Sequence, residues 1–199
     1  MQPWIMIQTG MVTGWEDKMN IREELGKRML FFDGGLGSLL QARGLKPGEL
    51  PETWNLSKPE ELLAIHKEYL EAGADIILAN TFGANRFKKY DHLQEIVEAA
   101  VKNAKKAAEE CGRNAYVALD LGPTGKLLKP MGTLDFEEAV SVYAEVVKIG
   151  AAAGADLILI ETMSDTYELK AAVLAAKENS DLPVVATVVF DESHKMLTG

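Results

Sequence analysis

A ten-residue segment occurs twice in this chain of 199 residues, and the repeat constrains the fold more than any other feature. Residues 72–81 read AGADIILANT, and residues 153–162 read AGADLILIET, 81 positions further along. Each copy runs from a glycine that can end a helix, through an apolar strand, to a polar residue. A block of that length holds two strand–helix units of about 40 residues each. The repeat therefore predicts a parallel sheet whose strands are joined by helices.

Five apolar runs are predicted to be buried strands, and helical patterns follow the first four. Two α/β folds accept this arrangement: a (β/α)8 TIM barrel, truncated here to about five βα units, and a five-stranded doubly wound sheet. A doubly wound sheet gathers its ligand loops at one switch point, whereas here polar residues follow strand after strand, so the barrel is favoured. The predicted strands are Met29–Phe32, Ile76–Asn80, Tyr116–Asp120, Leu157–Glu161 and Val184–Phe190.

Composition excludes several classes of protein. The formal charge of -9 argues against a nucleic acid or an anionic membrane as partner, because both require a basic surface. The single cysteine, Cys111, fits a reducing compartment, and no apolar run approaches the ~20 residues of a membrane helix. We expect a cytoplasmic protein. Residues 1–20 show no apolar period and are predicted to be a flexible leader, with the domain over residues 21–199.

The segment MLFFDGGLGS, residues 29–38, ends a predicted strand in an acid followed by glycines. Glycines at Gly34, Gly35 and Gly37 let backbone amides approach a ligand closely. A phosphate is disfavoured, because Asp33 would repel it and no lysine completes a phosphate-binding loop. A carboxylate beside free amides suits a ligand with both an amine and an acid, such as an amino acid. The alternative is that Asp33 caps the following turn and the glycines only shape it.

Four motifs, in their order and spacing, resemble the homocysteine S-methyltransferase family, and within it the homocysteine-binding domain of cobalamin-dependent methionine synthase. They are DGGLGS (33–38), IHKEYLEAGADIILANTFGA (65–84), LGPTGKLL (121–128) and ETMSD (161–165). The segments NLSKPE and GPTGKLLKPMGTLDFEE favour the methionine synthase branch over the betaine-dependent branch. The resemblance covers about residues 21–199 and corresponds to the N-terminal part of that domain.

The resemblance implies a (β/α)8 barrel that binds homocysteine at the carboxyl ends of its strands. Asp33 and Glu161 would hold the ammonium group, and the amides of Gly34 to Ser38 would receive the carboxylate. Ser38 stands where the family usually has threonine, which keeps the hydroxyl. Asn80 and Thr81 would line the pocket.

The resemblance also implies a zinc ion held by three cysteines. In the methionine synthase branch, methylcobalamin would supply the methyl group and methyltetrahydrofolate would regenerate it on other domains. Cys111 is the single cysteine here, and its place between a helix and the next strand predicts that it lies opposite the ligand loops. We therefore expect this chain to supply homocysteine-binding residues but no catalytic residue and no metal ligand. Alone it should be inactive and bind neither zinc nor cobalamin tightly. Its partners would be the cobalamin and folate domains of the parent enzyme, and open barrel edges would permit self-association.

Two alternatives stay open at this point. One is a non-catalytic amino-acid-binding or interaction protein that keeps the half-site without the metal. The other is an unrelated βα-barrel enzyme that uses Asp33 and Glu161 as general acid and base. The three histidines do not have the spacing of a zinc site and are interpreted as packing or surface residues: His66, His92 and His194.

Overall fold

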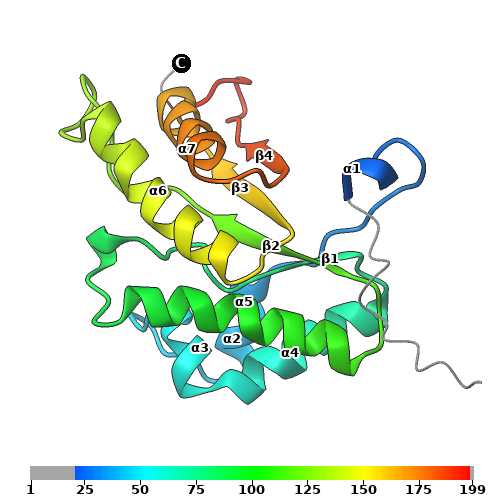
Figure 1. Ribbon diagram of the computed structural model, residues 1–199. Helices are drawn as coiled ribbons and strands as arrows, with labels where there is room; N and C mark the ends of the chain where they lie inside the picture. The colour runs from blue at the N-terminus through cyan, green and yellow to red at the C-terminus, as the bar shows by residue number, and fades with distance from the viewer. Residues whose placement is uncertain (1–20, 198–199) are drawn as a thin grey trace, which may run out of the picture.

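Four strands form one parallel sheet whose spatial order follows the sequence (Figure 1). The computed structural model describes residues 21–197, so the predicted leader over residues 1–20 lies outside the described residues. The order β1-β2-β3-β4 confirms the prediction that successive strands are neighbours, as in a barrel. The closed barrel stays a prediction, since the described strands form an open sheet. The strands are β1 (Ile76–Leu78), β2 (Tyr116–Leu121), β3 (Leu157–Met163) and β4 (Val184–Val188).

The first predicted strand, Met29–Phe32, is wrong as a full strand, because the structure has a single bridge there between Phe32 and Ile76. The amides of Asp75 and Ile76 both donate to the carbonyl of Phe31, at 2.8 and 3.0 Å, so no regular ladder forms. The segment also lies at the edge of the described sheet, beside β1 alone. It still runs parallel to β1 and takes the place expected of a first barrel strand.

Helices connect the strands, as the alternating pattern predicts. Helix α4 begins at Pro59, which fits a first helical turn because proline lacks the amide hydrogen that such a position leaves unpaired. It ends at Ala72 and is capped by Gly73, whose φ of 111° is the left-handed conformation that glycine adopts easily. The helices are α1 (Ile21–Glu24), α2 (Leu36–Ala42), α3 (Trp54–Ser57), α4 (Pro59–Ala72), α5 (Leu93–Glu110), α6 (Phe136–Ala152) and α7 (Thr166–Asn179), with 3-10 turns η1 (Pro51–Thr53) and η2 (Arg86–Lys88).

Alternate residues of the strands face two different apolar clusters, as a period of two requires. The outer face packs against α4, α5, α6 and α7, through side chains such as Val117, Leu119 and Ile158. Helix α6 approaches this face closely, because a Cβ on Gly150 would lie 2.4 Å from a methyl carbon of Leu119. The inner face carries a smaller cluster together with Ile21 of α1, and its strand residues are Ile76, Leu78, Tyr116, Ala118, Leu157 and Leu159.

At the carboxyl ends of the strands, the side chains on the inner face are polar. Two positions beyond Leu78, Ala118 and Leu159, the alternation places Asn80, Asp120 and Glu161 on this same face. The apolar layer below them excludes water and fixes the strands, since each buried Leu or Ile side chain contributes roughly 1.5–3 kcal/mol. The fold therefore holds a polar layer of side chains at one end of a rigid sheet.

The two outer edges of the described sheet expose apolar side chains. Met29 and Phe31 are exposed beside β1, and Val188 and Phe190 are exposed at and after β4. Such edges are sites where another chain or segment can pair. Self-association through them stays a prediction.

Candidate ligand-binding site

A cavity of about 440 Å³ lies at the carboxyl ends of the strands. Its floor comes from the end of β1, its walls from the glycine loop, η1 and the ends of β2 and β3. The lining residues are Asp33, Gly34, Gly35, Leu36, Gly37, Leu40, Pro51, Glu52, Leu78, Ala79, Asn80, Phe82, Asp120, Glu161 and Thr162. None of these lining residues is Lys, Arg or His, whereas four are acids. The cavity is therefore suited to a ligand that brings its own positive charge.

Three of the acids have raised pKa values, in each case mainly because the side chain lies out of water. Burial, aided by the charge of Glu161, raises the pKa of Asp33 to about 7, although the amide of Leu78 donates to its Oδ2 at 2.9 Å. Burial, together with the carboxylates of Glu161 and Asp33, raises the pKa of Asp120 well above its usual value. Burial also raises the pKa of Glu161. Among the described residues, Asp33 Oδ1 and Asp120 Oδ1 are buried and accept no hydrogen bond.

The fourth acid, Glu52, is committed to the cavity wall instead. Its Oε1 accepts a hydrogen bond from the amide of Gly83 at 2.7 Å, and its Oε2 accepts one from the Tyr90 hydroxyl at 2.7 Å. Both oxygens thus hold the loop after β1 against η1. A sequence pattern could not identify this role, because Glu52 lies outside every strand end and its partners come from a distant loop.

Asn80 is fixed by a second set of hydrogen bonds. Its Nδ2 donates to the carbonyl of Pro51 at 2.9 Å and to Asn55 Oδ1 at 3.1 Å, while Asn55 Nδ2 donates back to the Asn80 carbonyl at 2.8 Å. Asn80 is nearly fully buried. It therefore presents a rigid polar wall to the cavity.

The glycine loop brings backbone amides to the cavity. Gly34 and Gly35 precede α2, and their amides donate no hydrogen bond to any described residue. The Tyr69 hydroxyl donates to the Gly35 carbonyl at 3.2 Å, and a Cβ on Gly34 would lie 3.0 Å from that hydroxyl. The loop is packed where a larger residue would be tight, and it leaves amide donors beside Asp33.

The loop after β2 is anchored from behind by a buried acid. Glu168 Oε1 accepts hydrogen bonds from the Thr124 amide at 2.7 Å, the Thr124 hydroxyl at 2.6 Å and the Tyr143 hydroxyl at 3.0 Å. Gly122 lies so close to Phe82 that a Cβ would be 2.7 Å from the Phe82 carbonyl oxygen. These contacts fix Phe82, which lines the cavity, without contributing a charge to it.

The structure brings six of the eight predicted substrate-binding residues to this one cavity: Asp33, Gly34, Gly35, Gly37, Asn80 and Glu161. The other two lie outside its lining. Ser38 is exposed and its hydroxyl donates to the Gly35 carbonyl at 3.1 Å, whereas Thr81 is buried and its hydroxyl donates to the Asp120 carbonyl at 2.8 Å. Asp120 was left out of the predicted set, although the pattern of polar strand ends already contained it.

Cys111 was predicted to lie opposite the ligand loops, at the amino ends of the strands. Cys111 caps the carboxyl end of α5, five positions before β2 begins, and thus lies toward the amino ends of the strands. His66 is buried in α4, where burial lowers its pKa to about 4 and neither ring nitrogen has a partner among the described residues. Within residues 21–197, no group of three or more His, Cys, Asp or Glu side chains is arranged to hold a metal ion.

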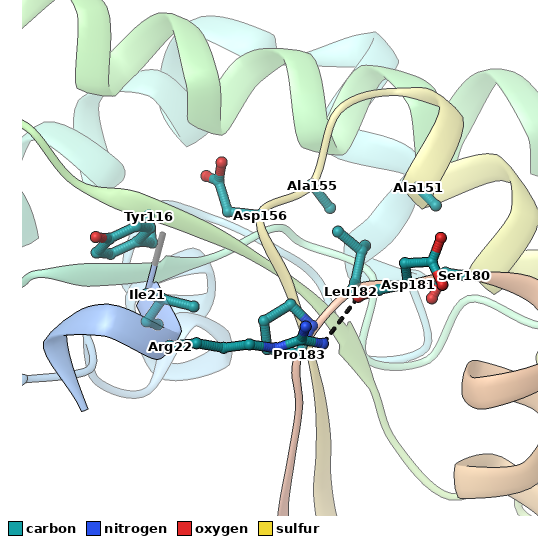
Figure 2. Close-up of a pocket in the computed structure, with 10 residues that line it drawn as sticks. All are labelled: Ile21, Arg22, Tyr116, Ala151, Ala155, Asp156, Ser180, Asp181, Leu182 and Pro183. Atoms are coloured by element: carbon teal, nitrogen blue, oxygen red, sulfur yellow. Dashed lines mark hydrogen bonds between the residues drawn. The ribbon is translucent and has the colours of Figure 1, made fainter. Parts of the chain in front are cut away.

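A second cavity, of about 550 Å³, lies at the amino ends of the strands (Figure 2). There Arg22 donates to the Asp181 carbonyl at 2.9 Å, and Figure 2 shows Tyr116 and Asp156 on the other side of the cavity. Asp156 pairs with Lys105 at 2.8 Å and accepts from the Val117 amide at 2.7 Å. This cavity is larger, but Asp156 already has a cationic partner and Arg22 also lines it, so it is less suited to a positively charged ligand.

Known proteins resemble this chain in sequence and in fold. The family model for homocysteine S-methyltransferase matches residues 30–199. The chain is 31% identical to a methionine synthase from Mycobacterium tuberculosis, over 90% of this chain but 17% of that protein, so it spans about a sixth of that relative's length. Within the described part of the chain, no helix has both the length and the apolar character needed to cross a membrane.

Solved structures show the same fold. The oxidized form of the homocysteine methyltransferase MmuM from Escherichia coli matches with a TM-score of 0.76 at 21% identity, over 89% of this chain and 68% of that one. Its metallated form matches with the same TM-score at 20% identity, over 89% and 69%. The match of the family model to most of the sequence, on this fold, shows that the chain belongs to the homocysteine S-methyltransferase family.

Proposed function

We propose that the chain is the homocysteine-binding part of a methionine synthase, in which the sulfur of homocysteine accepts a methyl group to give methionine. Family membership supports the substrate and sets aside the alternative of an unrelated barrel enzyme. The relative from Mycobacterium tuberculosis supports the methionine synthase branch. The cavity of unpaired acids beside free amides is the observation that carries the proposal.

Different residues of the cavity bind the different charged groups of an amino acid. Asp33 and Glu161 face the ligand's ammonium group, because both are acids without a cationic partner in the cavity lining. The free amides of Gly34 and Gly35 receive the carboxylate, since backbone N–H groups are strong donors to an anion. Asn80 restricts how the ligand lies between them. The side chain of the ligand is thereby directed away from the charged groups.

Zinc and cobalamin belong to the proposed parent enzyme rather than to these residues. A site of three cysteines does not fit this sequence, which holds Cys111 alone, and that cysteine lies toward the amino ends of the strands. The cobalamin and folate domains of the parent enzyme, and a cytoplasmic location, stay predictions.

The 199-residue chain alone is therefore expected to transfer no methyl group from methylcobalamin to homocysteine. Calorimetric titration with zinc, beside an assay for methionine, checks this expectation. Tight stoichiometric zinc binding together with methionine formation would show that residues assigned here to structure are ligands. A chain that binds homocysteine but neither binds zinc nor forms methionine would fit both the proposed function and the non-catalytic alternative, in which these residues only bind the amino acid.

Binding of the amino acid is tested by removing its amine. L-Homocysteine and 4-sulfanylbutanoate, which lacks the amine, are titrated into the full chain under reducing conditions. We expect the analogue to bind about 100-fold more weakly, because it cannot pair with the acids and its carboxylate is still repelled by them. Equal affinities, or no binding of homocysteine, would overturn the proposal.

A further inference from the structure

Asp120 is an acid of the cavity that the resemblance does not assign to the ligand. It is the fifth residue of β2, and the alternation that sends Ala118 into the inner apolar cluster places Asp120 on the same face. Its side chain lines the cavity, yet the residue is only 5% exposed. Its Oδ1 accepts no hydrogen bond from any described residue. A buried oxygen directed into a cavity without a donor indicates that the donor arrives with the ligand.

A structural role does not account for this side chain. The backbone of Asp120 is held by Thr81, whose hydroxyl donates to the Asp120 carbonyl at 2.8 Å and accepts from the Asp120 amide at 3.1 Å. Strand β2 is also paired on both sides, with β1 and with β3. The carboxyl group is therefore not needed to fix the strand. Burial among other acids makes it a cost to the free protein, as its raised pKa reflects.

The number of donors on the ligand explains why a third acid is present. A primary ammonium group carries three N–H donors, like the side chain of lysine. If Asp33 and Glu161 each accept one N–H under the proposed function, the third N–H is available to Asp120, whose buried Oδ1 has no donor. Glu52 is less available than Asp120, because each of its oxygens already accepts a hydrogen bond, from the Gly83 amide and from the Tyr90 hydroxyl.

We propose that Asp120 accepts the third hydrogen bond from the ammonium group of the ligand and makes the cavity select a primary amine over an N-methylated one. This inference rests on the proposed function, because it takes the ligand to be an amino acid in this cavity. An N-methyl group would replace one N–H and leave a buried oxygen facing a methyl group. A site built to accept a hydrogen bond discriminates most strongly against a ligand that leaves its buried acceptor oxygen unpaired.

The test measures the affinity of the full chain for L-homocysteine and for N-methyl-L-homocysteine by calorimetry. We expect the unmodified chain to bind the primary amine at least about tenfold more tightly. The variant Asp120→Leu keeps a similar shape without an acceptor, so it should bind homocysteine about tenfold more weakly and lose the preference. Asp120→Asn keeps a carbonyl acceptor, so it should lose at most about fivefold and retain the preference. Asp156→Asn, at the amino ends, is the matched control and should change neither value.

The outcomes separate the inference from the proposed function. If the unmodified chain binds neither ligand, the proposed function fails and the inference fails with it. If it binds both amines equally, the inference alone is wrong. A preference that survives in Asp120→Leu overturns it. A preference lost in Asp120→Asn overturns it as well, because asparagine keeps a carbonyl acceptor and the two ligands carry the same charge. Should Asp120→Leu not fold, equal binding of the two ligands by the unmodified chain, or loss of the preference in Asp120→Asn, still overturns the inference.

Discussion

Acidic side chains lie at both ends of the sheet, but their hydrogen-bond partners and the directions of their pKa shifts differ. At the amino ends, Asp75 pairs with Arg28 at 2.8 Å and accepts from the Phe31 amide at 2.9 Å. Burial raises the pKa of Asp75, but these two donors outweigh it and leave the pKa below its usual value. At the carboxyl ends, Asp33 and Asp120 each keep a buried oxygen without a donor, and their pKa values are raised.

Glu24 shows how completely the amino end is paired. The hydroxyl of Tyr116 donates to Glu24, and Arg28 donates to its other oxygen at 2.6 Å. The bond from Tyr116 contributes most to lowering the pKa of Glu24. Acids that stabilise a fold are surrounded by donors of the same chain, whereas acids that wait for a ligand are not. The pairing of an acid, more than its presence at a strand end, therefore separates structure from function in this molecule.

The largest effect should follow from neutralising the two acids assigned to the ammonium group. The double variant Asp33→Asn with Glu161→Gln should bind L-homocysteine about 100-fold more weakly, because the ligand's charge loses both of its partners. Calorimetry on the full chain measures this. The matched control is Asp75→Asn at the other end, whose homocysteine affinity should not change. Similar losses in both variants would mean that the two ends do not differ in function.

The affinity for homocysteine should depend on pH through Asp33. The free cavity holds a proton on Asp33 below about pH 7, and the ammonium ligand favours the ionised carboxylate, so that proton must leave on binding. The affinity should therefore fall about tenfold for each pH unit below 7. Above pH 7 the contribution of Asp33 should level off. Titrations between pH 5 and pH 8 would contradict this account if the affinity were constant.

The amino end should respond in stability instead of binding. Asp156→Ala removes the acceptor for the Val117 amide and for Lys105, and we expect the free energy of unfolding to fall by about 2 kcal/mol. Denaturant unfolding of the variant and the unmodified chain measures the difference. An unchanged stability combined with weaker homocysteine binding would reverse the roles assigned to the two ends.

The smallest effect should be a gain of stability at the carboxyl end. Because the pKa of Asp33 is about 7 in the folded chain, the folded state keeps a proton that the unfolded state releases near pH 4, so stability falls as pH rises between these values. Asp33→Asn removes this cost while keeping an acceptor for the Leu78 amide. Three pKa units correspond to about 4 kcal/mol, but asparagine still buries an amide group, so we expect a net gain in the free energy of unfolding of about 1 kcal/mol at pH 8 and little effect at pH 4. A loss of stability at pH 8 would show that Asp33 is a structural residue.

Periodicity and the internal repeat predicted the positions and the order of β1 to β4, because apolar alternation and helix-ending glycines are local signals. They failed at Met29–Phe32. There the amides of Asp75 and Ile76 both donate to the Phe31 carbonyl, so this edge segment forms no regular strand. The repeat also placed Asn80 and Glu161 at equivalent strand ends, and both line the cavity.

The limits of the prediction were set by tertiary contacts. Ser38 and Thr81 have the right residue types, but their hydroxyl groups are bonded to nearby backbone and lie outside the lining. Asp120 was visible as one more polar strand end. The absence of a donor for its Oδ1 distinguishes it from a structural acid, and no sequence pattern records such an absence.

The most direct test is to follow the side-chain carboxyl groups by carbon-13 NMR as a function of pH, with and without saturating L-homocysteine. In the free chain, we expect Asp33 to titrate near pH 7, while Asp75 titrates below the usual aspartate range. On binding, the pKa of Asp33 should fall by at least about one unit, because a positive charge now lies beside it, and Asp75 should not move. If Asp33 titrates near 4 in the free chain, or if homocysteine shifts Asp75 as much as Asp33, the division between a paired structural end and an unpaired ligand-binding end is wrong.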